Sequence, residues 1–243
     1  MQDIATSNAA AASLIGWWRD AGVDVLVDEV AVPWLQKARA TPDSKPPTKA
    51  NQVQPAPSDA PLPESLAALT HWLMTSADVP DTAPPSRRIA ASGAAGAALM
   101  ILIDMPEAND HETGQLLSGE CAKLFDNMLA AIGLDRSSVY VAALCPARPV
   151  TGRLNDAALP RLTEIARHHV ALAVPKRLWL MGGAVSRALL GVDDVASRGN
   201  LHDFNHATVK VPTVASFAPR FLLDHPAQKA GAWADMQMLI KGM

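Results

Sequence analysis

The chain has 243 residues, of which 49% are hydrophobic and 19% are charged, and its formal net charge at pH 7 is −3. This length suits one globular domain with additional segments, and the composition excludes a wholly disordered chain. The slightly negative charge argues against a strongly basic nucleic-acid-binding protein. The two cysteines, Cys121 and Cys145, are too few for a disulfide framework or for the four thiolates of a common iron–sulfur cluster.

The sequence also argues against a membrane protein. No uncharged apolar run approaches the roughly 18 residues of a membrane-spanning helix. The residues from Met1 to Ile4 lack the basic and apolar regions with which a secretory signal peptide begins. These features predict a cytoplasmic protein that does not contact a membrane.

Residues 1–40 are predicted to form a helical segment. Ser7 or Asn8 can cap a helix over residues 9–21, which places Trp17 and Trp18 on its apolar face. Two hypotheses remain open for this segment. Its apolar residues either dock on the body of the protein and complete its core, or form a tethered peptide that inserts Trp17, Trp18 and Trp34 into a partner protein.

A proline-rich linker is predicted over residues 41–63, which contain seven prolines in 23 residues. Mostly polar residues separate these prolines, and few apolar side chains are available for burial. This composition favours an extended, solvated backbone. The linker therefore separates the N-terminal segment from a globular body over residues 64–243.

The body alternates apolar runs with helical patterns. Apolar runs occupy residues 97–103, 139–144, 177–181 and 209–217, and helical patterns occupy 121–132, 157–173, 184–190 and 228–240. Apolar strands alternating with helices predict an α/β fold, with a mainly parallel, four-stranded sheet covered on both faces. Pro212 suits an edge or a bulge better than a central strand. His202 and His206 are interpreted as surface residues of a loop.

Ligands of parallel α/β sheets bind beyond the carboxyl ends of the strands. The segments to search are therefore 104–117, 143–153, 182–184 and 218–225. These segments carry a family resemblance, which includes the strand and helix predicted over residues 180–191. The motif Ile103-Asp-Met-Pro-Glu107, the pair Arg148-Pro149 and the motif Phe217-Ala-Pro-Arg-Phe-Leu-Leu223 follow one another in the body. Their order and spacing resemble those of the uracil-DNA glycosylase superfamily, and most closely its family 4-like bacterial members.

The resemblance runs from about Ala97 to Ile240 and implies a three-layer α/β/α fold. In the family, the first motif reads Gly-Glu-Ala-Pro-Gly and the last reads His-Pro-x-Tyr-Leu-Leu. The enzymes flip a base out of DNA, hold its edge and face, and stabilise it as it leaves. The base-pocket positions that this resemblance transfers are Ile103, Met105, Pro106, Glu107, Leu117 and Ala143.

Several residues at these positions depart from the family pattern. Leu117 replaces the stacking phenylalanine, Ala143 the asparagine that reads uracil, and Ala218 the histidine that stabilises the leaving base. Asp104 replaces the glutamate of the first motif and is one methylene shorter. His225 would replace the missing histidine only if the turn after Ala218 folded back. The resemblance therefore implies a degenerate site with no expected catalytic residue.

Ile103 and Glu107 replace the flanking glycines of the first motif, and Glu107 adds a negative charge where a nucleotide would lie. The family's cluster cysteine before Arg-Pro corresponds to Ala147, so we expect no iron–sulfur cluster. Cys121 and Cys145 are interpreted as inert core thiols. The loop with Asp110 matches no common metal-ligand pattern, and a solvated loop without metal is predicted.

Two hypotheses for function follow. One is a binding or scaffold protein associated with DNA repair or replication that has lost base excision and contacts its protein partner through the tryptophans of residues 1–40. The other is an active DNA glycosylase with an altered pocket. Weak, salt-sensitive contacts with DNA phosphates are one interpretation of the loop arginines, and ordinary solvated charges are the other. These arginines are Arg148, Arg153, Arg198 and Arg220.

Overall fold

The computed structural model describes residues 61–81, 84–191, 197–206 and 209–241. The predicted N-terminal segment with Trp17, Trp18 and Trp34 lies outside these residues, as does the linker up to residue 60. In the part of the chain that is described, no helix is long and apolar enough to cross a membrane.

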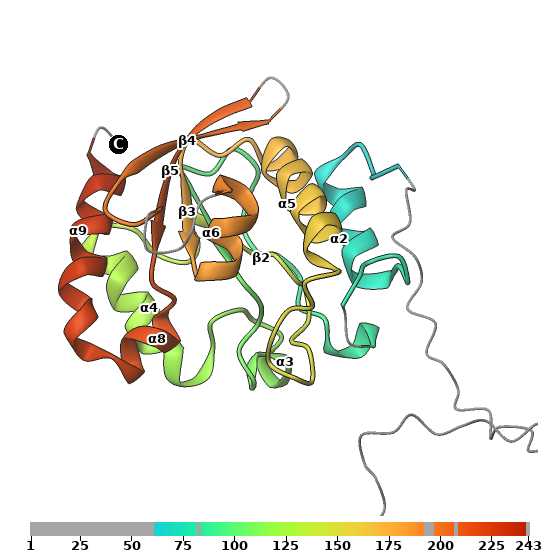
Figure 1. Cartoon of the computed structure of the whole chain (residues 1–243), viewed down its shortest axis with the longest axis horizontal. Helices are drawn as coiled ribbons and strands as arrows, with labels where there is room; N and C mark the ends of the chain where they lie inside the picture. The colour runs from blue at the N-terminus through green and yellow to red at the C-terminus, as the bar shows by residue number, and fades with distance from the viewer. Residues whose placement is uncertain (1–60, 82–83, 192–196, 207–208, 242–243) are drawn as a thin grey trace, which may run out of the picture. The chain divides into compact units, whose positions relative to one another are not determined.

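The centre of the body is a five-stranded sheet (Figure 1). Its strands lie in the order β2, β1, β3, β5, β4, with β4 antiparallel to β5 and the others parallel. The strands are β1 (Leu99–Ile103), β2 (Val139–Ala143), β3 (Leu178–Met181), β4 (Leu201–His206) and β5 (Val209–Ser216).

Strand alternation builds two hydrophobic layers, one on each face of the sheet. Leu99, Ile101 and Ile103 of β1 belong to one buried cluster, whereas Met100 and Leu102 belong to the other. Because both faces are covered, every residue of β1 is buried. This explains why the strand is apolar throughout rather than alternately polar.

Helices cover both faces (Figure 1). One face packs against α4 (Gly119–Ala131), α8 (Pro219–Asp224) and α9 (Lys229–Ile240), and the other against α5 (Leu159–Ala173) and α6 (Gly183–Leu190). Three shorter elements are α3 (Asp110–Thr113), η1 (Pro85–Arg87) and η2 (Pro226–Gln228). The predicted three-layer α/β/α fold is confirmed.

The sequence prediction of four strands is one short. Residues 201–206, interpreted as a loop with His202 and His206, form the edge strand β4. Only Phe204 of this strand is buried, so the segment lacks an apolar run. β5 consequently lies between β3 and β4 rather than at the edge. Pro212 is tolerated because the ladder with β3 begins only at Thr213.

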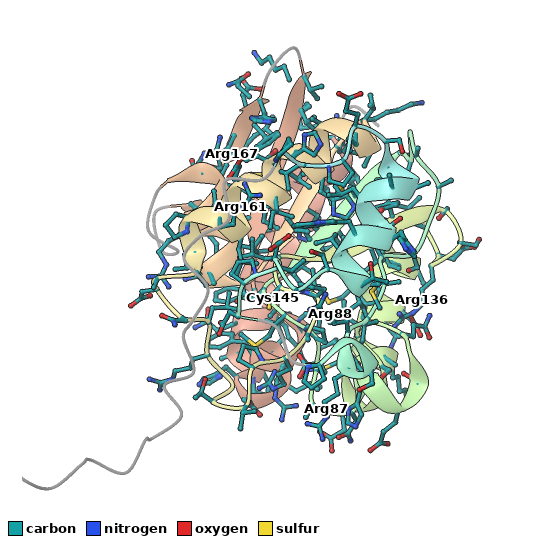
Figure 2. The ribbon with its side chains drawn as sticks, turned by 90° about the vertical axis from the view of Figure 1, so that its right-hand side faces the viewer. Arg87, Arg88, Arg136, Cys145, Arg161 and Arg167 are labelled. Atoms are coloured by element: carbon teal, nitrogen blue, oxygen red, sulfur yellow. The ribbon has the colours of Figure 1, made fainter. Side chains whose placement is uncertain are left out.

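Helix α2 (Leu66–Thr75) was not predicted, and it packs outside α5 through Leu69 and Leu73. Ser65 caps its first turn, accepting the Ala68 N–H at 3.3 Å. The Arg88 guanidinium holds its other end, donating to the Leu73 and Ser76 carbonyls at 2.9 and 2.7 Å. Figure 2 shows Arg88 beside Cys145, where the loop after β2 meets this helix.

Candidate functional site

The carboxyl ends of the parallel strands bring the candidate residues together. In the sheet register, Ile103 pairs with both Ala143 and Met181, and Met181 pairs with Ser216. The loop after β1 carries Asp104 and Glu107, the loop after β2 carries Arg148, and the loop after β5 carries Ala218. The sequence therefore predicted the correct edge of the sheet for these residues.

Asp104 follows β1 directly and faces the start of α6. Its Oδ1 accepts the Val185 N–H at 2.7 Å. Gly182 has a φ of +135°, and a Cβ built there would overlap the Asp104 carboxylate. The glycine is thus needed for both its backbone conformation and this close approach. The shortened acidic residue holds the first turn of α6 against the end of β1.

The two positions expected to read and release a base carry methyl groups. Ala143 ends β2 and lines a cavity of about 10 Å³ with Ala142, Pro146 and His169, which is room for roughly one water molecule. Ala218 is the N-cap residue of α8 and is partly buried. Neither side chain can donate or accept a hydrogen bond.

A larger hollow of about 170 Å³ lies on the α4, α8 and α9 side and is mainly apolar. It is lined by Leu124, Met128, Leu222 and Trp233, among others. Neither this hollow nor the small cavity is lined by Asp104, Glu107 or Ala218. The polar groups at the strand ends are therefore not gathered around either space.

Asp110 is fully buried, so the prediction of a solvated acidic loop is wrong at this residue. Its carboxylate accepts the backbone N–H groups of Glu107, Leu117 and Ser118 at 2.8, 2.9 and 2.7 Å, and the Ser118 hydroxyl at 2.7 Å. We name this arrangement the Asp110 clasp. His111, next along the chain, is exposed. The clasp closes the loop between β1 and α4.

Leu117 is held by the clasp in a left-handed conformation, with a φ of +55° and only 1% of its surface exposed. Arg136, labelled in Figure 2, donates to the Leu116 and Leu117 carbonyls at 2.8 and 2.6 Å. Its guanidinium also lies 4.7 Å from the centre of the Phe125 ring. Leu117 is consequently a core residue, fixed through its backbone on both sides.

Glu107 lies beside two of the arginines predicted at this edge. Its Oε2 is 3.5 Å from an Arg220 guanidinium nitrogen, whereas Arg148 donates to the Pro106 carbonyl at 3.1 Å. Burial raises the pKa of Glu107, and the charges of Arg220 and Arg148 partly oppose this rise. We name Glu107, Arg148 and Arg220 the Glu107 cluster.

The other two arginines, Arg153 and Arg198, have different surroundings. Arg153 is exposed, and Arg198 places its guanidinium 3.9 Å from the centre of the Phe217 ring. Phe217 stacks on Phe221 at 5.0 Å, and Phe221 stacks on His225 at 4.2 Å. His225 therefore packs along α8. The three rings are spaced four residues apart in the sequence, and this spacing could have predicted that they stack along one face of a helix.

Asp235 of α9 is a further buried carboxylate that the sequence analysis did not identify. It is 3% exposed and accepts the Gly199 N–H at 3.0 Å. Burial raises its pKa, while the nearby Ser216 hydroxyl, the hydrogen bond from the Gly199 N–H and the charge of Arg198 oppose the rise. Its position on the apolar face with Ala232, Met236 and Leu239 is a signal that could have found it.

The residues present do not fit an iron–sulfur cluster. Ala147, which the sequence resemblance aligns with a cluster cysteine, is fully buried and has no ligating atom. Burial raises the pKa of Cys145 to about 12 and that of Cys121 to about 11, and the Cys145 thiol donates to the Ala147 carbonyl at 3.0 Å. Within the described ranges, no three His, Cys, Asp or Glu side chains are placed to hold a metal ion.

Comparison with known proteins agrees with the fold. The sequence model of the family described as the uracil DNA glycosylase superfamily matches residues 91–237, more than half of the chain. The chain is similar to a type-4 uracil-DNA glycosylase of Pyrobaculum aerophilum, with 24% identity over 157 residues, which cover 59% of this chain and 77% of that protein. The residues that the family model matches include all the described sheet strands and the loops at their carboxyl ends. The chain belongs to the uracil-DNA glycosylase superfamily.

Proposed function

We propose that this member of the superfamily has lost uracil excision and acts as a binding or scaffold protein associated with DNA repair or replication. The observation that carries the proposal is the pair of methyl groups at Ala143 and Ala218, where the strand ends converge. A base can be neither recognised nor released as an anion by groups that make no hydrogen bond.

The use of Asp104 supports the same conclusion. Its Oδ1 is engaged by the Val185 amide, so this oxygen is already committed to holding α6. Leu117, the counterpart of a stacking aromatic residue, is buried in the core. Each missing oxyanion donor typically costs about 10²–10³ in rate, and losses at several positions leave little residual catalysis.

The test is an excision assay on single- and double-stranded oligonucleotides that contain one uracil. We expect no cleavage above background from the full chain under conditions in which the Pyrobaculum aerophilum glycosylase excises uracil. Asp104→Asn serves as the matched variant, since an amide oxygen can still accept the Val185 N–H. Excision by the full chain that disappears in Asp104→Asn would overturn the proposal.

An active DNA glycosylase with an altered pocket is the second candidate, and Glu107 is the observation that favours it. Burial raises the pKa of this carboxyl, which suits a group that gives up a proton to a leaving base. Arg220 and Arg148 add positive charge nearby. Excision of a base other than uracil, abolished by Glu107→Gln, would establish this candidate in place of the first.

We further propose that the protein partner is bound through Trp17, Trp18 and Trp34, which lie outside the described residues. The triple Trp→Ala variant of the full chain should lose partners that the unchanged chain captures. Identical partners from both would contradict this interface.

The proposal also includes a cytoplasmic location and the absence of an iron–sulfur cluster. The cluster is proposed to be absent because the sequence supplies two cysteines, fewer than the four thiolates that such a cluster commonly needs.

A further inference from the structure

Glu107 is a largely buried carboxyl group with charged or titratable groups from several elements around it. Arg220 of α8 and Arg148 of the loop after β2 face it with positive charge, whereas Asp110 of α3 and the thiol of Cys121 in α4 lie close by. Its side chain is 13% exposed, while that of Arg220 is 50% exposed. The cluster therefore has a buried acidic end and a solvent-facing basic end.

The Glu107 carboxylate and the Arg220 guanidinium are farther apart than in a well-formed ion pair. Oε2 of Glu107 is buried and makes no hydrogen bond, although a guanidinium nitrogen of Arg220 lies 3.5 Å away. A carboxylate fitted to an arginine normally makes hydrogen bonds of about 2.7–2.9 Å. A buried carboxylate oxygen that has an ion-pair partner at 3.5 Å but no hydrogen bond is only partly compensated, so the pair is poorly optimised for stability.

We propose that Arg148 and Arg220 form a subsite for a phosphate group at the carboxyl edge of the sheet, and that Glu107 is an internal occupant which must be displaced before phosphate binds. Guanidinium groups suit phosphate oxygens because several N–H donors lie in one plane. The same edge is where parallel α/β sheets bind their ligands. Glu107 thus acts as an autoinhibitory contact.

The inference rests on the proposed function only for the source of the phosphate, a nucleic-acid backbone. The geometry itself serves a free phosphate equally well. Binding is therefore measured separately with inorganic phosphate and with an oligothymidylate, and uracil excision is not the readout. Failure of this subsite and failure of the proposed loss of excision are consequently distinct results.

The central experiment compares the full chain with Glu107→Gln by calorimetric titration with inorganic phosphate at neutral pH. Removal of the competing charge is expected to tighten phosphate binding by about tenfold or more, the size of one charged hydrogen bond. Adding Arg220→Gln to Glu107→Gln should abolish the gain. Thermal unfolding of each variant shows that it is folded, and Glu107→Ala repeats the test if Glu107→Gln is not.

Matched controls separate the subsite from general electrostatics. Glu112→Gln removes one exposed negative charge from the same loop and should leave phosphate binding nearly unchanged. Arg153→Gln, added to Glu107→Gln, removes an exposed positive charge and should preserve the gain. An equal gain in Glu112→Gln, or a gain that survives Arg220→Gln, overturns the subsite.

The second arm uses an oligothymidylate, whose phosphodiesters keep their charge across mildly acidic pH. Its binding to the unchanged chain should strengthen as the pH falls and Glu107 takes up a proton, and Glu107→Gln should flatten this dependence. Tighter binding of both ligands by Glu107→Gln supports a nucleic-acid subsite. A gain for inorganic phosphate alone supports the subsite but assigns it to free phosphate, and a gain for neither overturns the inference.

Discussion

Asp110 and Glu107 lie three residues apart in the loop after β1, yet their surroundings differ. In the Asp110 clasp, the carboxylate is fully buried and accepts hydrogen bonds from three amides and one hydroxyl. In the Glu107 cluster, one carboxylate oxygen is buried without a hydrogen bond and faces Arg220 at 3.5 Å. The clasp fixes the path of the backbone, whereas the cluster leaves a charge incompletely compensated.

The difference teaches where this fold tolerates change. A carboxylate that holds backbone amides cannot be removed without exposing several unpaired donors. A carboxylate paired only with side chains can be exchanged while the backbone keeps its course. At this edge of the sheet, the backbone is therefore held by hydrogen bonds to a buried carboxylate, whereas the side chains that face one another can be exchanged more freely.

Asp110→Ala is expected to have the largest effect, because it breaks the clasp. Loss of the acceptor leaves the amides of Leu117 and Ser118 unpaired in the interior, and the free energy of unfolding should fall by about 3–4 kcal/mol. Urea denaturation measures the change. Glu112→Ala, two residues away and exposed, should change stability by less than about 0.5 kcal/mol. Similar losses in both variants would show that the clasp does not stabilise the fold.

The buried pair of His169 and Tyr140 offers a second comparison, within the core rather than at the edge. Their side chains meet at 2.7 Å between Nε2 and the phenol oxygen. Burial, with a smaller contribution from His168, lowers the pKa of His169 to about 4. The unfolded chain therefore binds more protons than the folded chain between about pH 6.5 and pH 4, and stability decreases as the pH falls through that range.

This titration should cost about 3 kcal/mol of stability once the pH is below 4. Urea unfolding at a series of pH values measures the slope, and His169→Gln should reduce it because glutamine does not titrate. His111→Gln, at an exposed position in the loop, should leave the slope unchanged. A slope that persists in His169→Gln would assign the acid sensitivity to other groups.

The sequence predicted the framework well, because coverage of both faces makes a strand such as Leu99–Ile103 apolar throughout. It did not predict β4, whose single buried residue, Phe204, leaves no periodic signal. The carboxyl edge followed from the alternation of apolar runs with helical patterns, because that alternation predicts parallel strands whose carboxyl ends share one edge. The contacts of each side chain at this edge could not be predicted from the sequence, because Arg136 and Arg220 reach their partners from distant segments.

The burial of Asp110 could not be predicted from the sequence either. Charged loop residues are usually exposed, and this one is buried because the chain turns back to present the amides of Leu117 and Ser118. The turn depends on the left-handed conformation of Leu117, which residue type does not indicate. Local composition therefore predicts elements, whereas the polar contacts of the site require the path of the chain.

Introducing the residues that the sequence resemblance assigns to Ala143 and Ala218 should have unequal effects. Ala143→Asn places an amide beside a cavity that admits about one water, and overpacking should lower stability by about 1–3 kcal/mol. Ala218→His, at the partly buried N-cap of α8, should cost less than about 1 kcal/mol. Thermal unfolding of the two single variants tests this order. A larger loss from Ala218→His would mean that the start of α8 is the more tightly packed position.

Glu107→Gln should have the smallest effect on stability, within about 1 kcal/mol at neutral pH, because it exchanges an incompletely paired buried charge for a neutral amide. Its pH dependence is more informative. Burial raises the pKa of Glu107 in the folded protein, so the folded chain binds more protons than the unfolded chain between the ordinary and the raised pKa. Stability is therefore lost as the pH rises through this window.

Urea unfolding across mildly acidic pH should show that loss in the unchanged chain and a weaker one in Glu107→Gln. Arg220→Gln should act in the opposite direction: without the guanidinium that lowers the pKa of Glu107, the pKa rises further and the window widens. The two variants thus change the slope with opposite sign. If both changed it in the same direction, Arg220 would not be the group that compensates the buried carboxylate, and the contrast with the self-sufficient Asp110 clasp would no longer hold.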